Sequence, residues 1–367
     1  MILWPAEFNA RKEAVFAALA QAEGGGRRLW TIPWSRADFP ETAARVQVCL
    51  SRAKRQPRGL FRRLKALLIR LQYNGARRLF LRQPQALAVA WNGLGGSRQA
   101  FLLAARDAGV ARLSAELAPF PGRITLDWAG VNAESAVPRA AEFFTAWAGA
   151  DPARNGEGWR ALGAGLVARP SRRADVGQAT TALPDSPFLF CPLQVPSDSQ
   201  VTLFAGWCGG MAGFLAALGQ AAAHLPPGWH LRLKEHPSAR ISLTADLAPL
   251  LAAGRVVLDN TTDSFAQLAA SRGVVVLNSS MGLQAFFHDK PVVVLGEAYF
   301  RQPGLVLPVA GQAALDAAFA GAAALGFDPL ARAQFMNWLD QVYYPRIDPP
   351  DRAALRAKLA QARAIRR

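Results

Sequence analysis

Asparagine, two serines and a glycine lie close together in Asn278-Ser279-Ser280-Met281-Gly282, where a strand pattern changes to a helical one. An apolar run over 274–277 precedes this segment, and a helical pattern over 280–288 follows it. Free backbone N–H groups at a helix N-terminus bind phosphate well, and two hydroxyl groups add further donors. Gly282 permits the close approach of a backbone or a ligand. Simple N-capping by one serine is the alternative, and the sequence leaves both interpretations open.

Lys234-Glu235-His236-Pro237 ends a second strand pattern, which alternates in polarity over 229–235. Pro237 prevents the strand from continuing. His236 has a ring N–H that can be donated to a phosphate or to a nucleotide carbonyl, and Lys234 lies on the same strand face two residues earlier. A lone histidine at the end of a strand is, however, more often a simple surface residue.

A third polar segment is Gln194-Val-Pro-Ser-Asp198, which follows an apolar run over 188–193. Asp198 in such a loop can serve as a nucleophile, a base or a metal ligand. Pro-Ser-Asp-Ser is also good turn chemistry, and without further information the turn interpretation is the stronger one.

Strand and helix patterns alternate around these segments. Strands are predicted over 188–193, 229–235, 255–259, 274–277 and 291–295, and helices over 211–224, 262–272 and 280–288. This alternation predicts an α/β fold with a doubly wound parallel sheet, whose ligands lie outside the carboxyl ends of the strands. Those ends carry Gln194, His236, Asn260, Asn278 and Gly296-Glu297. Ordinary loop polarity is the alternative for any single strand end.

Length and composition set limits on the protein. The 367 residues suit two domains, predicted as 1–183 and 184–367, and 51% hydrophobic residues suffice for two cores. Lys and Arg number 42 and Asp and Glu 26, so the net charge is +16 and favours an anionic partner. Three cysteines and four histidines without metal-ligand spacing argue against a disulfide scaffold and a zinc site. No apolar run long enough to span a membrane and no signal-peptide pattern is found, so we expect a cytoplasmic protein.

One segment of the first half, residues 52–82, is strongly basic and contains no acid. Leucines and Phe61 recur at positions 60, 61, 64, 67, 68 and 71, which follows a helical period. A basic amphipathic helix of this kind suits an anionic membrane surface. A core helix with a solvated basic face is the alternative. Nucleic acid is not expected as a partner, because few aromatic residues are present to stack bases. The eleven basic residues are Arg52, Lys54, Arg55, Arg58, Arg62, Arg63, Lys65, Arg70, Arg77, Arg78 and Arg82.

Residues 194–304 resemble the bacterial capsule polysaccharide synthesis proteins, the retaining β-Kdo transferases. The pieces that carry the resemblance are QVPSD (194–198), KEHP (234–237), the stretch 259–300 and Pro303-Gly304. AWNG (90–93), the stretch 114–132 and Tyr343-Tyr344 extend it to the first half. The resemblance implies a GT-B fold, with two Rossmann-like domains facing across a cleft. It makes 1–183 the acceptor side and 184–367 the nucleotide-sugar domain, with the last helices returning to the first domain.

The resemblance also implies site residues. Asp198 would be the nucleophile, Glu116 the acid/base on the acceptor side, and His236 a positive group that stabilises the departing phosphate. The donor CMP-Kdo would be held by Gln194, Lys234, His236, Pro237, Asn278, Ser279, Ser280 and Gly282. CMP leaves as a phosphate anion, so it needs positive stabilisation more than a proton donor. No cofactor and no metal ion is expected, because this scheme requires none and the sequence has no DxD-like pair placed to hold a metal.

The function implied is transfer of Kdo from CMP-Kdo, with retention, to a lipid or Kdo-lipid acceptor of the phosphatidylglycerol type. The expected location is the cytoplasmic face of the inner membrane, with other capsule synthesis and export proteins as possible partners. Two alternatives remain. One is another GT-B transferase, with a sialic-acid-like donor or a polyol phosphate. The other is a non-catalytic capsule assembly or export factor.

Overall fold

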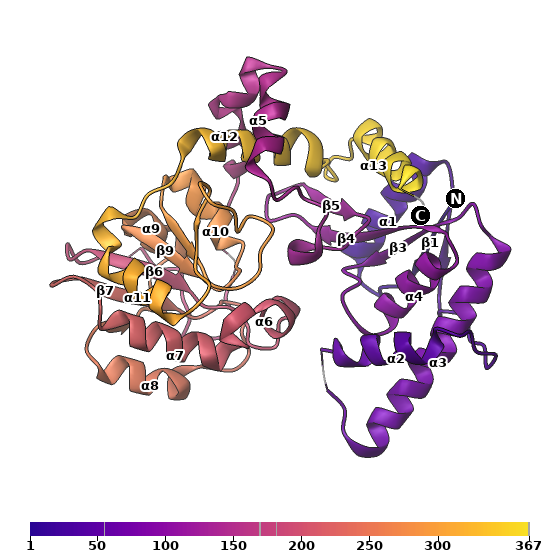
Figure 1. Cartoon of the computed structure of the whole chain (residues 1–367), viewed down its shortest axis with the longest axis horizontal. Helices are drawn as coiled ribbons and strands as arrows, with labels where there is room; N and C mark the ends of the chain where they lie inside the picture. The colour runs from indigo at the N-terminus through magenta and orange to yellow at the C-terminus, as the bar shows by residue number, and fades with distance from the viewer. Residues whose placement is uncertain (55, 169, 181, 366–367) are drawn as a thin grey trace. The chain divides into compact units, whose positions relative to one another are not determined.

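The computed structural model describes residues 1–54, 56–168, 170–180 and 182–365, so Arg55 of the basic segment lies outside the described residues. The chain forms two compact units (Figure 1). Unit 1 consists of Met1–Val137 together with the segment that starts at Leu339, and unit 2 is Pro138–Trp338. None of the helices in the described residues is both long enough and apolar enough to cross a membrane.

Unit 1 is built on a five-stranded sheet in the order β2-β1-β3-β4-β5, parallel except for β5. Its strands are β1 (Ile2–Pro5), β2 (Gly26–Leu29), β3 (Leu87–Trp91), β4 (Ala111–Leu117) and β5 (Ile124–Asp127). Its α-helices are α1 (Ala10–Glu23), α2 (Thr42–Ser51), α3 (Gly59–Arg82), α4 (Gly96–Asp107) and α13 (Arg352–Ala364). A 3-10 turn (Asn132–Glu134) and a π-helical turn (Leu339–Tyr343) complete the unit.

The central strands of unit 1 are apolar on both faces because helices cover both faces. Leu3, Ala88 and Ala90 contribute to the core beneath α2, α3 and α4. Their sequence neighbours, such as Trp4 and Val89, point to the opposite side and pack with α1 and α13. This alternation is the period of two that a strand imposes on its side chains.

Unit 2 contains a six-stranded parallel sheet in the order β11-β10-β9-β6-β7-β8. Its strands are β6 (Phe188–Pro192), β7 (His230–Lys234), β8 (Val256–Leu258), β9 (Gly273–Val276), β10 (Val292–Val294) and β11 (Leu307–Pro308). Its α-helices are α5 (Ala141–Gly149), α6 (Ser199–Phe204), α7 (Met211–Ala222), α8 (Thr244–Ala252), α9 (Ser264–Ala270), α10 (Met281–Gln284), α11 (Gln312–Ala320) and α12 (Pro329–Trp338). Its 3-10 turns are Pro152–Asn155, Glu157–Gly163, Gly206–Cys208, Ala285–His288 and Ala322–Ala324.

The α/β fold class predicted from the sequence is confirmed. All five strands expected in the second half form, and the parallel pairing of β9 and β10 buries the valine runs completely. The helix expected over 280–288 is shorter: α10 ends at Gln284 and a 3-10 turn continues to His288.

The division into units differs from the boundary expected at residue 183, which falls inside unit 2. Residues 138–163 belong to unit 2 because α5 and the turns after it pack on α12. Phe144 contacts the rings of Phe335 and Trp338, and Asn337 Nδ2 donates to Arg154 O and Gly156 O, both at 2.8 Å. The chain later returns to unit 1, where α13 packs against α1.

The basic segment forms α3, but the apolar stripe predicted from its leucines is not the face that enters the core. The buried side chains are Ile69, Tyr73, Ala76 and Phe80. Leu60, Phe61, Leu64, Leu67 and Leu68 remain exposed. The helical period was therefore predicted correctly, while the choice of the buried face depends on the second half of the helix.

Candidate active site

The strand order in the sheet of unit 2 reverses between β6 and β9, which are neighbours in space but not in sequence. Strands β7 and β8 extend from β6 on one side, and β10 and β11 extend from β9 on the other. Loops that follow the two strands at such a switch point diverge and leave room for a ligand. The loop after β6 carries Gln194 and Asp198, and the loop after β9 carries Asn278, Ser279 and Ser280.

Gln194 and Asn278 hold these two loops together. Gln194 Nε2 donates to Asn278 Oδ1 at 3.0 Å, and Asn278 N donates to Gln194 Oε1 at 3.3 Å. Asn278 Nδ2 donates to the carbonyl oxygens of Gln200 and Phe204, both at 2.9 Å. Both amide protons of Asn278 are therefore engaged within the protein, so this residue shapes the site and does not offer them to a ligand.

Asp198 is exposed and is the N-cap of α6. Its Oδ1 accepts a hydrogen bond from Gln200 N at 2.9 Å. Within the described part of the chain its Oδ2 accepts no hydrogen bond. The turn interpretation is thus correct for one carboxylate oxygen, and the second oxygen is left to react or to bind.

The two serines are partly exposed, whereas Gly282 is buried. Ser279 Oγ accepts a hydrogen bond from Met281 N at 3.3 Å, which leaves its proton available to a ligand. A Cβ at position 282 would approach the ring of Phe300 to 2.9 Å. The close approach expected at Gly282 is therefore seen with Phe300, and contact of Gly282 with the donor stays a prediction.

Lys234 also differs from the prediction. Its Nζ donates to three carbonyl oxygens, Gly177 O at 2.8 Å, Asn260 O at 2.9 Å and Thr262 O at 2.7 Å. An ammonium group has three protons, so none remains for a phosphate. Burial lowers the pKa of Lys234, and the neighbouring Asp259 and Asp263 oppose that shift. Lys234 therefore fastens the loops beside β7 and does not reach the donor.

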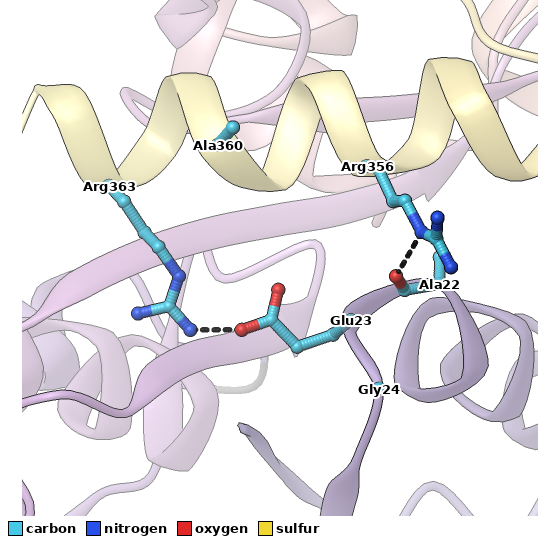
Figure 2. Close-up of a pocket in the computed structure, with 6 residues that line it drawn as sticks. All are labelled: Ala22, Glu23, Gly24, Arg356, Ala360 and Arg363. Carbon is cyan, nitrogen blue, oxygen red and sulfur yellow. Dashed lines mark hydrogen bonds and ion pairs between the residues drawn. The ribbon is translucent and has the colours of Figure 1, made fainter.

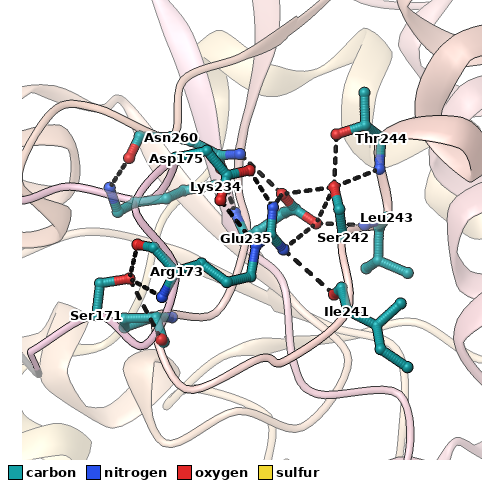
Figure 3. A network of polar contacts seen from close by, with 11 residues as sticks. Ser171, Arg173, Asp175, Lys234, Glu235, Ile241, Ser242, Leu243, Thr244 and Asn260 are labelled. Atoms are coloured by element: carbon teal, nitrogen blue, oxygen red, sulfur yellow. Dashed lines mark hydrogen bonds and ion pairs between the residues drawn. The ribbon is translucent and has the colours of Figure 1, made fainter.

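Glu235, which the sequence did not single out, is the centre of a polar network (Figure 3). Arg173 donates to both of its oxygens, at 3.1 and 2.9 Å, and Asn260 Nδ2 donates at 2.8 Å. Leu243 N also donates to this carboxylate. Arg173 lies 62 positions before Glu235 in the sequence. Only the fold brings these two residues together, so no local sequence signal indicated the pair.

His236 follows this anchored pair and is partly exposed. Its Nδ1 accepts a hydrogen bond from Ser238 N at 3.0 Å. The neutral ring consequently carries its proton on Nε2, which is the position that can donate to a phosphate oxygen. Pro237 fixes the turn through its carbonyl oxygen, which accepts from Arg172 N at 2.8 Å.

Glu116 lies near the end of β4 in unit 1, and two asparagines donate to its carboxylate. Asn92 Nδ2 donates to Oε1 at 3.3 Å, and Asn132 Nδ2 donates to Oε2 at 3.1 Å. Both asparagines adopt left-handed backbone conformations, with φ of 63° and 54°. Such conformations are uncommon outside glycine, and asparagine is among the residues that adopt them most often. Sequence analysis missed both residues, although each lies inside a quoted motif.

A surface pocket of about 330 Å³ lies elsewhere, between the end of α1 and α13 (Figure 2). Its lining contains none of the predicted site residues. Its arginines are engaged, since Arg363 pairs with Glu23 and Arg356 Nε donates to Ala22 O at 2.8 Å. We assign this pocket to the packing of α13 rather than to the active site.

Comparison with known proteins agrees with this description. The family model for capsule polysaccharide biosynthesis proteins matches residues 165–317. Protein FixF of Sinorhizobium fredii is 31% identical over 276 residues, which cover 74% of this chain and 64% of FixF. Capsule polysaccharide modification protein LipB of Neisseria meningitidis serogroup A is 32% identical over 125 residues, 32% of this chain and 30% of LipB. The matched part of this chain thus spans less than two thirds of the length of these relatives.

Among solved structures, the β-Kdo 2,7-transferase of Thermosulfurimonas dismutans KpsC has a similar fold. The TM-score is 0.53, the identity is 13%, and the match covers 97% of this chain and 99% of that one. The GT-B fold class implied by the sequence is confirmed. The resemblance predicted from the sequence is also confirmed, because the family model for capsule polysaccharide biosynthesis proteins matches residues 165–317.

Proposed function

We propose that this protein is a retaining glycosyltransferase that moves Kdo from CMP-Kdo to a lipid or Kdo-lipid acceptor of the phosphatidylglycerol type in capsule polysaccharide synthesis. The observation that carries the proposal is the arrangement at the carboxyl end of the unit 2 sheet. Asp198 exposes an unshared carboxylate oxygen there, and neighbouring strands supply Ser279, Ser280 and the Nε2 donor of His236. The name of the matched family supports a role in capsule polysaccharide synthesis, and the name of the structural relative supports the transfer of Kdo.

In the first step, Asp198 Oδ2 attacks the anomeric carbon of Kdo while the bond from that carbon to the phosphate oxygen breaks. CMP leaves with the electron pair, and the donors of His236 and of the serines stabilise its negative charge. In the second step, the acceptor hydroxyl attacks the same carbon, its proton passes to Glu116, and the ester bond to Asp198 breaks. Two inversions give net retention.

The same two-step mechanism would give retention with any other CMP-linked ulosonic acid. The identity of the donor sugar therefore needs a separate test. CMP-Kdo and CMP-sialic acid are offered in competition, and we expect transfer of Kdo. We further propose that transfer requires no metal ion, so a chelator should leave the rate unchanged. We propose that the protein acts at the cytoplasmic face of the inner membrane, where a lipid-linked acceptor and other capsule synthesis and export proteins would be present.

The decisive experiment is the intact mass of the protein after mixing with CMP-Kdo in the absence of acceptor, for the native chain and for Asp198→Asn. We expect a gain of one Kdo residue in the native chain only. Release of CMP after addition of a lipid acceptor, without any adduct, would support the transferase function and contradict a long-lived covalent intermediate. If neither an adduct nor CMP appears with any acceptor, the protein is a non-catalytic assembly factor or uses another donor.

A further inference from the structure

Helix α3 has two separate apolar faces. Ile69, Tyr73, Ala76 and Phe80 form the first face, and it is buried in the core of unit 1. The second face is exposed and consists of Leu60, Phe61, Leu64, Leu67 and Leu68, whose side chains are between 37% and 75% exposed. At 3.6 residues per turn, the centres of the two faces lie roughly 150° apart around the helix. The second face therefore cannot be an extension of the core.

Large apolar side chains rarely gather on one exposed helix face of a soluble protein without a partner. The N-terminal half of α3 extends past α2 (Figure 1), and every residue from Arg58 to Leu64 is exposed. We call residues 58–68 the α3 tip. The core of unit 1 is complete without the α3 tip, because the contributions of α3 to that core begin at Ala66 and Ile69.

The charges of the α3 tip indicate what its partner is. Arg58, Arg62 and Arg63 are exposed and form no ion pair among the described residues. Farther along the helix, Arg70 is paired with Asp38. The segment 52–82 has eleven basic residues and no acid. An apolar stripe beside uncompensated arginines is the pattern of a helix that lies on an anionic lipid surface, where arginines meet the head groups and leucines reach the acyl boundary.

A tryptophan extends the exposed stripe. The segment Pro33–Ser35 crosses α3 one turn beyond Leu68, where Ser35 N donates to Leu71 O at 3.0 Å. Gly75 admits this crossing, since a Cβ there would lie 1.9 Å from Pro33 O. Trp34 in this segment is 63% exposed. Tryptophan is enriched at the interface between membrane and water, so its position fits the same partner.

We infer that the α3 tip is a membrane-binding surface that recognises anionic lipid bilayers through Phe61, Leu64, Leu67 and the adjoining arginines. This inference does not rest on the proposed transferase function. Binding of lipid without any substrate tests it, whereas CMP release tests the transfer reaction, so the two fail separately.

The experiment is flotation of the full chain with vesicles of phosphatidylcholine alone or mixed with phosphatidylglycerol. We expect binding only to the mixed vesicles and weaker binding at high salt. The variant Phe61→Ser/Leu64→Ser/Leu67→Ser should lose about tenfold or more of its partitioning. The variant Arg58→Gln/Arg62→Gln/Arg63→Gln should lose about fivefold for each arginine removed.

Two matched controls carry substitutions of the same kind at exposed positions outside α3. They are Val167→Ser/Ile241→Ser/Leu330→Ser and Arg11→Gln/Arg27→Gln/Arg240→Gln. Both should bind like the native chain, and all four variants should keep the native unfolding midpoint. If the apolar variant misfolds, vesicle binding by the arginine variant alone tests the inference.

Equal loss in the variants and their controls would overturn the inference, because the effect would then be one of general charge or hydrophobicity. Native binding by both α3 variants would overturn it as well. A native dimer that the apolar variant converts to a monomer, with vesicle binding unchanged, would assign the face to a second copy of the chain and also overturn it.

Discussion

Gln194 and Asn278 exchange two hydrogen bonds across the point where the strand order of the unit 2 sheet reverses, between β6 and β9. One bond joins the two side chains and the other joins the backbone of Asn278 to Gln194 Oε1. The loop that carries Asp198 and the loop that carries the two serines are therefore fixed relative to each other within unit 2. In the proposed reaction, a nucleophile and a phosphate site held in this way would need little rearrangement when a donor binds.

Substitution of Asn278 should loosen this connection. Asn278→Ala removes the side-chain amide that donates to Gln200 O and Phe204 O, so both carbonyl oxygens lose this hydrogen bond. We expect the free energy of unfolding to fall by about 2–4 kcal/mol. Urea unfolding measures this loss, and the neighbouring Ser279→Ala, whose side chain makes one weak contact, is the control. A loss in Asn278→Ala no larger than that of the control would contradict the role assigned to Asn278.

Asp198 is the N-cap of α6 and the proposed nucleophile, and two variants separate these two roles. Asparagine also caps helices well, so Asp198→Asn should keep the stability of α6 while it loses the nucleophile. Asp198→Ala loses both, and we expect a further cost of about 1 kcal/mol in the free energy of unfolding. CMP release and urea unfolding are measured on the same preparations. Near-native turnover of Asp198→Asn would contradict the covalent mechanism.

Much of unit 2 was predictable because its signals are local. Buried parallel strands appear as uninterrupted valine runs, and polar residues mark the points where those strands end. The sequence also placed Lys234 on the correct strand. It did not indicate that three carbonyl oxygens from two other segments surround its ammonium group. The contact of Gly282 with Phe300 is likewise a property of the folded chain.

Three further features lay beyond sequence reasoning, each for its own physical reason. Glu235 and Arg173 are far apart in the chain, so their pairing depends on how the segment after residue 163 docks on the sheet. In α3, both faces are apolar, and periodicity alone does not choose between them. The positions of Asn92 and Asn132 around Glu116 needed backbone angles that the sequence does not state.

Asn132 is expected to position Glu116 for proton transfer. Glycine adopts a φ of 54° without strain, so Asn132→Gly removes the amide donor and keeps the backbone. We expect kcat to fall by about tenfold or more, with little change in the KM for CMP-Kdo, because Asn132 acts through Glu116 and not on the donor. Asn155→Gly, an asparagine of unit 2, is the control. An unchanged kcat in Asn132→Gly would show that this hydrogen bond has no part in catalysis.

The ion pair of Glu235 and Arg173 should make stability depend on pH. Burial acts to raise the pKa of Glu235, but hydrogen bonds from Arg173, Leu243 N and Asn260 outweigh it and hold the pKa below its ordinary value. A carboxyl group with a lower pKa in the folded chain stabilises the fold at any pH above its unfolded pKa, which is about 4.3. That contribution is lost as the pH falls below about 4 and through the folded pKa.

Glu235→Gln removes the titrating group and keeps its shape. At pH 7 we expect a loss of about 3 kcal/mol in the free energy of unfolding, because the charge of Arg173 loses its buried partner. The difference between the native chain and the variant should then shrink as the pH is lowered from 5 to about 3, since the native carboxylate becomes protonated. Urea unfolding midpoints across this range measure the effect. Asp175→Asn, which removes the exposed partner of Arg173, is the control and should change the midpoint little. A difference between Glu235→Gln and the native chain that stays constant with pH would mean that Glu235 acts through packing rather than through its charge.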